Sequence, residues 1–262
     1  MPGRPPAVRE AIVAHRLGCF CSDHGLGAAE VGAEVVEAFA VLGLAARASS
    51  TRGTYRSVLR ALAVSSRPVL ATPFAASPAP RPYSGAERAE LSSTASSQRS
   101  AWRRSSALAM LSLGIGAGLR AGELAALRGR DVAAGHHGVS VVVAGTRARL
   151  VIVGGTYAEA LARLAGRGGD DHLFCPGPAQ RSYHNFVNNF ARTLQSAPDA
   201  PRLSSGRCRS SFICDHLAAG TPLAELLYIS GIAQVESLLR YARHVTGAPS
   251  SKAELRARLA AC

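Results

Sequence analysis

The residue types best suited to chemistry lie in one stretch, RSSFICDHLAAGTPLAELLYISGIAQVESLLRYARH, from Arg209 to His244. It opens on an arginine and closes shortly after a tyrosine, Tyr241. A guanidinium binds phosphate through forked hydrogen bonds, and a phenol hydroxyl can act as the nucleophile in covalent catalysis. The stretch therefore combines an anion-binding group with a nucleophile, provided that the chain between them folds so that they meet.

Three short helical patterns separate Arg209 from Tyr241 and would have to position them. Their expected inward residues are Phe212, Ile213, Leu217, Leu223, Leu226, Leu227, Val235, Leu238 and Leu239. Gly220 and Gly231 stand where left-handed helix ends are expected. Thr221 is predicted as the N-cap of the middle helix, with a proline in its first turn. Tyr241 is expected beside the apolar face of the third helix.

This stretch resembles the C-terminal signature of the tyrosine recombinases, the phage-integrase family. In that signature an H-x-x-R box opens a helix, a glycine turn ends the next helix, and a nucleophilic tyrosine follows. Aligned without gaps, Arg209 takes the arginine of the box, Gly231 the turn glycine and Tyr241 the nucleophile.

A second match lies upstream, in GLRAGELAALRGRDV, which looks like the family's first arginine box. Arg120 takes its catalytic arginine, Glu123 and Leu124 its E-L pair, and Asp131 its closing acid. The two boxes occur in the family's order. The resemblance implies a mainly α fold with a small antiparallel β-sheet, arranged as a two-domain clamp around double-stranded DNA. It also implies self-assembly on the DNA as a dimer or tetramer.

Cleaving a DNA phosphodiester without a metal needs a nucleophile and its base, positive charge on the non-bridging oxygens, and an acid for the leaving 5′-oxygen. The resemblance implies that Tyr241 forms a 3′-phosphotyrosyl link while Arg120 and Arg209 stabilise the developing charge. Because a phenol is almost fully protonated at neutral pH, it needs a base or a nearby cation. We expect no metal and no cofactor.

Three positions depart from the family pattern. Gly206 stands at the histidine of the H-x-x-R box, Ile232 at the second histidine or tryptophan, and Ala144 at the lysine of a β-hairpin. Arg147 and Arg149 lie in or just after that hairpin turn and are candidates to replace part of the lost charge. Two arginines and the tyrosine are thus retained, while the usual acid and base are not.

The charge of the chain favours a nucleic acid partner. Thirty basic residues face seventeen acidic ones, a formal net charge of +13, and every basic residue except Lys252 is an arginine. Such a surface binds phosphates with release of counterions. A soluble protein that is merely basic would show the same balance, so the charge supports the two arginine boxes without replacing them.

Composition argues against a membrane or a zinc protein. The chain has no run of about 18 apolar residues and no apolar stretch at its N-terminus, so we expect neither a membrane span nor a signal peptide. Its six cysteines are scattered, and Cys19 and Cys21 are too close for the usual zinc spacing. We expect reduced, mostly buried thiols and a cytoplasmic protein.

The pattern along the chain divides it into a helical domain over residues 1–64, a proline-rich linker over 65–82 and a larger domain over 83–262. Residues 1–27 are poorly patterned and are expected to be partly mobile. Helices are predicted from Ala28 to about Gly43 and from about Thr54 to Val64. The second of these would place Arg52, Arg56 and Arg60 on an outer face, where we expect them to contact DNA.

In the larger domain, Ser84 and Glu87 form a capping box at its first helix. Helices are expected over 100–113, 156–166 and 183–194, and a β-hairpin over 139–153. The glycines of GIGAG, residues 114–118, are expected to end a helix. A phosphate-binding loop is the alternative there, and it is disfavoured because the G-K-S/T signature is absent.

Three functions remain open from the sequence. The chain could be an active recombinase, a non-catalytic DNA-binding relative, or a basic helical protein with an accidental likeness. Taken singly, Arg120 could pair with Glu123, Arg209 could lie on the surface and Tyr241 could be a packed aromatic. The retained tyrosine favours the first function, and the missing acid and base groups favour the second.

Overall fold

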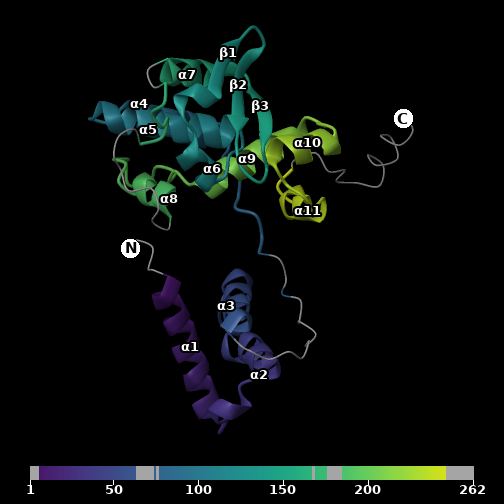
Figure 1. Cartoon of the computed structure of the whole chain (residues 1–262). Helices are drawn as coiled ribbons and strands as arrows, with labels where there is room; N and C mark the ends of the chain where they lie inside the picture. Colours follow the sequence, from purple (N-terminus) through teal and green to yellow (C-terminus); the bar gives the residue numbers. More distant parts are fainter. Residues whose placement is uncertain (1–5, 63–73, 75–76, 167–168, 176–184, 246–262) are drawn as a thin grey trace. The chain divides into compact units, whose positions relative to one another are not determined.

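The computed structural model describes residues 6–62, 74, 77–166, 169–175 and 185–245 (Figure 1). The chain forms two compact units, Met1–Pro78 and Ala79–Cys262. The division falls inside the proline-rich segment predicted as a linker, of which residues 65–73 and 75–76 lie outside the described part. In the described ranges no helix combines the length and the apolar character that crossing a bilayer requires.

The first unit is a small helical assembly. It contains α1 (Pro6–Asp23), a 3₁₀ turn (Ala28–Glu30), α2 (Ala33–Ala38) with a π-helical turn after it (Phe39–Gly43), and α3 (Ser49–Leu62). The interpretation that residues 1–27 are poorly patterned is wrong for α1. Val13, Leu17, Phe20 and Cys21 form a stripe at helical spacing, and this stripe packs on Phe39 in the core of the unit.

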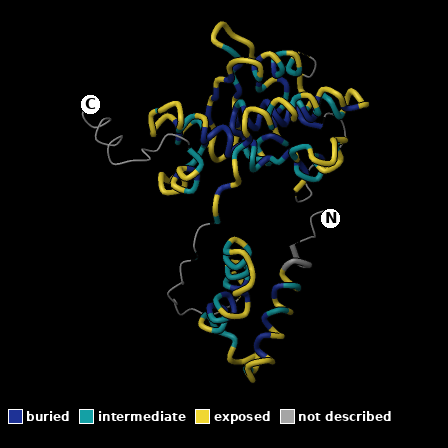
Figure 2. The backbone as a smooth tube through the Cα atoms, turned by 180° about the vertical axis from the view of Figure 1, so that it is seen from behind, coloured by how far each residue is buried: buried dark blue, intermediate teal, exposed yellow. Residues whose placement is uncertain are grey.

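The second unit is mainly helical with one small sheet, as predicted (Figure 1). Its helices are α4 (Gly85–Ser96), α5 (Ala101–Leu111), α6 (Ala121–Ala126), α7 (Gly155–Ala165), α8 (Phe186–Ala191), α9 (Ser205–Ala218), α10 (Leu223–Ser230) and α11 (Glu236–Ala242). The predicted capping box at α4 is confirmed, since the Glu87 amide donates to Ser84 Oγ at 3.2 Å and the Ser84 amide donates to Glu87 Oε2 at 2.8 Å. Many residues of α5 and α9 are buried. Figure 2 shows that the buried backbone of the second unit lies mainly in its interior.

The sheet is antiparallel, with the strands β1 (Val132–Gly135), β2 (Gly138–Val143) and β3 (Arg149–Val153) in sequence order. The hairpin predicted over 139–153 is confirmed, with Val141 opposite Val151 and Val143 opposite Arg149. Strand β1 was not predicted because its sequence, VAAG, has weak β propensity. Helix α7 packs on the sheet, and α10 lies beside β3.

The glycines of residues 114–118 do more than end a helix, which corrects the expectation. Helix α5 runs on into a π-helical turn, Ser112–Gly116. A Cβ at Gly114 would lie 2.6 Å from Cys208 Cβ, and one at Gly118 would lie 2.3 Å from Phe212 Cδ1. Gly118 also has φ of +63°, which favours glycine. These glycines let α9 approach the π-helical turn closely.

The three helical patterns before Tyr241 are confirmed as α9, α10 and α11, and Gly220 and Gly231 are left-handed. The predicted cap is wrong: Pro222 is the N-cap of α10, while Thr221 Oγ1 lies 2.9 Å from His216 Nδ1. Several predicted inward residues are exposed instead, namely Leu223 (48%), Val235 (40%) and Leu239 (71%). Helices α10 and α11 are short, and each buries only one side. The buried residues are Leu226 and Ser230 in α10, and Leu238 and Tyr241 in α11.

Candidate active site

A surface cavity of about 580 Å³ brings together Arg120, Arg209 and Tyr241, the three residues to which the sequence assigned catalysis. We call it the arginine pocket. It is lined by Arg120, Arg147, Arg209, Ile232, Ala233, Gln234, Ser237, Arg240 and Tyr241. Arg120 comes from the start of α6, Arg209 from α9 and Tyr241 from α11, so the fold gathers three distant segments at one place.

Two arginines of the pocket are held by main-chain carbonyls. Arg120 is the N-cap of α6, and its Nη2 donates to the carbonyl oxygen of Gly231 at 2.8 Å. Arg209 is 9% exposed and donates to the carbonyl oxygens of Gly118 and of Ser230, the latter at 2.7 Å. Both side chains are therefore oriented before any ligand binds.

The two arginines of the hairpin have different positions. Arg147 lines the pocket and donates to the carbonyl oxygen of Gly231, beside Arg120. Arg149 does not line it. Its Nη1 and Nη2 donate to Glu123 Oε1 and Oε2 at 2.8 and 2.9 Å, and its Nε donates to the Ile229 carbonyl at 2.8 Å. Of the two candidates to replace the missing lysine, only Arg147 has access to a bound phosphate.

These arginines converge on the C-terminal end of α10. The consecutive carbonyls of Ile229, Ser230 and Gly231 accept bonds from Arg149, from Arg209, and from Arg120 with Arg147, respectively. The C-terminal end of a helix carries partial negative charge, which offsets repulsion among clustered guanidinium groups. The left-handed backbone of Gly231, with φ of +62°, presents its carbonyl at this point.

Burial and neighbouring charges shift the pKa values of Arg209, Arg120 and Glu123. Burial, and to a lesser degree the charge of Arg120, lowers the pKa of Arg209 to about 10, which still leaves it protonated at neutral pH. Burial also lowers the pKa of Arg120, with Arg147 and Arg149 adding to the effect. Burial alone would raise the pKa of Glu123. The hydrogen bonds from Arg149 and from the Arg120 amide outweigh it, so the pKa is lowered and the carboxylate stays ionised.

Tyr241 is buried against the core of the second unit while lining the pocket. The charge of its ionised phenol would raise the pKa values of both Arg120 and Arg209, which places the three groups within electrostatic reach of one another. The guanidinium carbon of Arg240 lies 5.8 Å from the centroid of the Tyr241 ring.

The positions that depart from the family pattern have different surroundings. Ile232 lines the pocket, so an apolar side chain occupies the place of a histidine or tryptophan. Gly206 lies outside the pocket, and a Cβ there would be 3.3 Å from Pro80 Cγ. Ala144 also lies outside it. The residues that line the pocket include no histidine, lysine or carboxylate that could transfer a proton.

Four lining residues were missed from the sequence: Ala233 and the polar residues Gln234, Ser237 and Arg240. Arg240 directly precedes Tyr241, and adjacent helical residues point about 100° apart. A shared pocket was therefore not expected from their positions. The only signal available in the sequence was the arginine next to the candidate nucleophile.

The arginines predicted to contact DNA in the first unit have partners within that unit. Arg56 and Arg60 each pair with Glu37 at 3.0 Å. Arg52 donates to the carbonyls of Ala40 and Val41 at 2.9 and 3.0 Å. These contacts join α3 to α2 and to the π-helical turn that follows it. DNA binding by these arginines stays a prediction.

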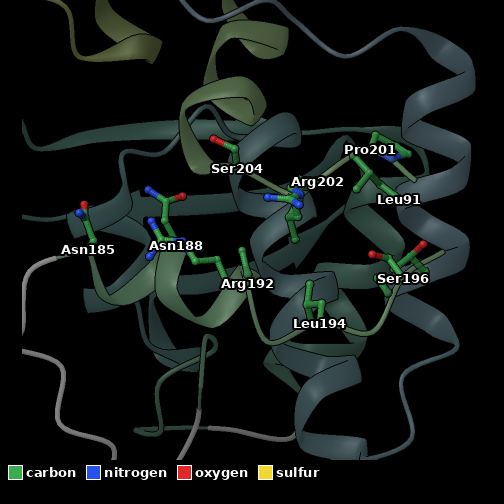
Figure 3. Close-up of a pocket in the computed structure, with 13 residues that line it drawn as sticks. Leu91, Asn185, Asn188, Arg192, Leu194, Ser196, Pro201, Arg202 and Ser204 are labelled. Atoms are coloured by element: carbon green, nitrogen blue, oxygen red, sulfur yellow. The ribbon is translucent and has the colours of Figure 1, made fainter. Parts of the chain in front are cut away.

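A second cavity, of about 650 Å³, lies between α4, α8 and the segment before α9 (Figure 3). Arg192, Arg202 and Ser204 are among its lining residues, and it shares none with the arginine pocket. Asn188, also at this cavity, accepts from the Ser205 amide and hydroxyl at 3.1 and 3.0 Å. The cavity contains no tyrosine among its lining residues, so we assign the candidate chemistry to the arginine pocket.

Comparison with known proteins gives a structural likeness. No protein-family model and no curated protein sequence matches the chain. Among solved structures, the XerH site-specific recombinase bound to its difH substrate is 14% identical, with a TM-score of 0.60 over 95% of this chain and 77% of that one. The Tn1549 transposon integrase in complex with transposon right end DNA is 15% identical, with a TM-score of 0.60 over 97% and 93%. At these identities the likeness establishes the fold: the chain has the fold of the tyrosine recombinases.

Proposed function

We propose that this protein is a site-specific DNA recombinase or integrase that cuts and rejoins strands through a 3′-phosphotyrosyl intermediate. The observation that carries the proposal is the convergence of Arg120, Arg209 and Tyr241 on one pocket within a recombinase fold. The two structural neighbours described above are DNA complexes, which supports double-stranded DNA as the partner. Assembly on DNA as a dimer or tetramer, and a cytoplasmic location, belong to the same proposal.

In the cleavage step, the Tyr241 oxygen attacks the phosphorus and the bond to the 5′-oxygen breaks. The phenol proton passes to water, and the leaving 5′-oxygen takes a proton to become a hydroxyl. Arg120 and Arg209 hold the non-bridging oxygens and stabilise the extra negative charge of the transition state. Rejoining is the reverse: a 5′-hydroxyl attacks the phosphotyrosine and releases Tyr241. The bond energy is kept in the covalent link, so no energy-rich cofactor is needed.

Proton transfer to the leaving oxygen should limit the rate at this site. Ile232 replaces a group that the family uses, and Arg147 hardly gives up its proton. Water must therefore supply the proton to the leaving oxygen. Loss of one general acid or base costs roughly 10²–10⁴ in rate, so we expect slow cleavage.

A second candidate function is a non-catalytic DNA-binding relative that regulates or assembles with an active partner. The specific observation in its favour is that no acid or base side chain lines the arginine pocket. In this case the arginines bind a phosphate that is never cut.

The experiment that separates the two starts by selecting bound duplexes from a random-sequence pool. Selected sites are then made as nicked suicide substrates, and denaturing electrophoresis detects a covalent protein–DNA adduct. We expect a slow adduct with the wild type and none with Tyr241→Phe, while both proteins bind equally. Tyr228→Phe, at an exposed tyrosine of α10, is the matched control. An undiminished adduct with Tyr241→Phe would identify another nucleophile, and binding without any adduct would favour the non-catalytic function.

A further inference from the structure

The charge in the arginine pocket exceeds what one phosphate requires. Arg120, Arg147, Arg209 and Arg240 line it, and no acidic residue does. Glu123, outside the lining, binds Arg149 through both carboxylate oxygens, and its Oε1 also lies 3.9 Å from Arg120 Nη1. The charges of Arg149 and Glu123 offset each other. A phosphodiester carries one negative charge, so the four guanidinium groups leave a surplus when a single phosphate is bound.

The four arginines enter the pocket from four different segments of the chain. Arg120, Arg147 and Arg209 are bonded to carbonyls at Gly118, Ser230 and Gly231. Arg240 instead comes from α11, the helix of Tyr241, and its guanidinium carbon is 5.8 Å from the Tyr241 ring centroid. Gln234 and Ser237, which precede it in the chain, add polar groups to the same wall. Arg240 thus adds positive charge on the side of the pocket that carries the nucleophile.

Successive phosphates of one DNA strand rise about 3.4 Å along the helix axis and, because the strand winds around that axis, lie roughly twice as far apart in space. A phosphate placed at Tyr241 therefore brings its neighbour along the strand to the same open cavity, whose volume is about 580 Å³. We propose that the arginine pocket binds two consecutive phosphates, and that Arg240 holds the flanking phosphate, which is not cut. This assignment rests on the proposed function and adds a substrate-binding residue to it.

The test is a scan in which single phosphates of a selected duplex are replaced, one at a time, by neutral methylphosphonates. Dissociation constants are measured by fluorescence anisotropy for the wild type, Arg240→Ala and Arg209→Ala. We expect Arg240→Ala to weaken binding about tenfold on unmodified DNA. At one position the methylphosphonate should weaken wild-type binding by a similar factor and cause no further loss in Arg240→Ala. The position coupled to Arg209 should be its immediate neighbour.

The salt dependence of DNA binding provides a second measurement. A purely structural role of Arg240 would leave this dependence unchanged. Removing one phosphate contact should reduce the slope of log K against log salt by about 0.9. Arg240→Lys, which keeps the charge, should keep most of the slope. Arg163→Ala removes the same charge from an exposed position on α7 outside the pocket and should leave slope and coupling unchanged.

Additive losses at every position, or an unchanged slope in Arg240→Ala, would overturn the assignment. Coupling of Arg240 and Arg209 to the same phosphate would overturn the two-phosphate pocket. Because the scan measures binding, it gives an answer even if no strand is cut. Coupling without any covalent adduct would thus refute cleavage and keep the role of Arg240. If the wild type binds no DNA, both proposals fail.

Discussion

Arg149 and Glu123 form a two-pronged ion pair with oxygen–nitrogen distances of 2.8 and 2.9 Å, and the arginine side chain is 1% exposed. The same carboxylate accepts the Arg120 amide at 2.8 Å, and the same guanidinium donates to the Ile229 carbonyl. One pair therefore joins β3, the start of α6 and the end of α10. The ion pair therefore holds in place the elements that carry the arginine pocket.

The first prediction contrasts the two arginines of the hairpin. Arg149→Ala should lower the free energy of unfolding by about 2–4 kcal/mol, because it leaves the partly buried Glu123 carboxylate with only the more distant Arg120 as an ion-pair partner. Arg147→Ala, at an exposed position, should change it by less than about 1 kcal/mol while weakening DNA cleavage. Denaturant titration of both variants measures the difference. Equal costs would contradict the structural role assigned to Arg149.

The second prediction concerns acid. The folded state lowers the pKa of Glu123, so its contribution to stability is present above the ordinary glutamate pKa and is lost as pH falls through the folded value. Glu123→Gln should therefore be less stable than the wild type at neutral pH, and the two should converge as the solution becomes acidic. Unfolding free energies across this range provide the measurement. Curves that run parallel would show that Glu123 is not the titrating group.

The third prediction concerns the left-handed turn after α10. Gly231→Ala should cost about 1–2 kcal/mol from backbone conformation alone, since φ is +62°. A Cβ there would also lie 2.8 Å from Arg149 Nη1, so the ion pair must shift and DNA binding should fall. Gly122→Ala, in α6 with nothing within 4 Å of the new Cβ, is the control and should be neutral or slightly stabilising. Thermal denaturation and DNA binding are compared for both.

The fourth prediction follows from the absence of an acid among the lining residues. A substrate whose leaving 5′-oxygen is replaced by sulfur needs no protonation, because a thiolate leaves unaided. We expect this 5′-bridging phosphorothioate to be cleaved much faster than ordinary DNA, with Tyr241 still required. Single-turnover rates on both substrates decide the matter. Similar, fast rates on both would mean that a proton donor outside the arginine pocket serves the reaction.

The fifth prediction concerns the start of the second unit. Ala79 and Tyr83 are buried in its core, and the Tyr83 hydroxyl donates to the Arg202 carbonyl at 2.6 Å. A fragment from residue 79 should fold, whereas one from residue 84 should lose about 3–5 kcal/mol of unfolding free energy, because the aromatic ring of Tyr83 is missing.

The fragment from residue 79 should still bind DNA more weakly than the whole chain. Equal affinities would argue against DNA binding by the first unit.

The sequence predicted the parts of the site that follow from local pattern. Arg120, Arg209 and Tyr241 sit in boxes of recognisable spacing, and the hairpin has β-branched runs around a glycine turn. The sequence could not predict that Arg147 lines the pocket while Arg149 is buried. That difference depends on Glu123, which lies on another element and pairs with Arg149. Arg240 was missed for a similar reason, since its access to the pocket depends on where α11 packs. Helix α1 was missed because small and polar residues interrupt its apolar stripe.

Residues just after α11, the last helix of the described residues, are bonded to the first residue of the second unit. The Ala79 carbonyl accepts from His244 Nε2 at 3.0 Å, across 165 positions of sequence, and from Arg243 Nη2 at 3.3 Å. Short helices open locally at low cost, and α11 is seven residues long. Fraying of α11 from its C-terminal end must first break these bonds, so order at Ala79 and order at α11 are thermodynamically linked. How firmly Tyr241 is held thus depends partly on Ala79, which is far from it in the sequence.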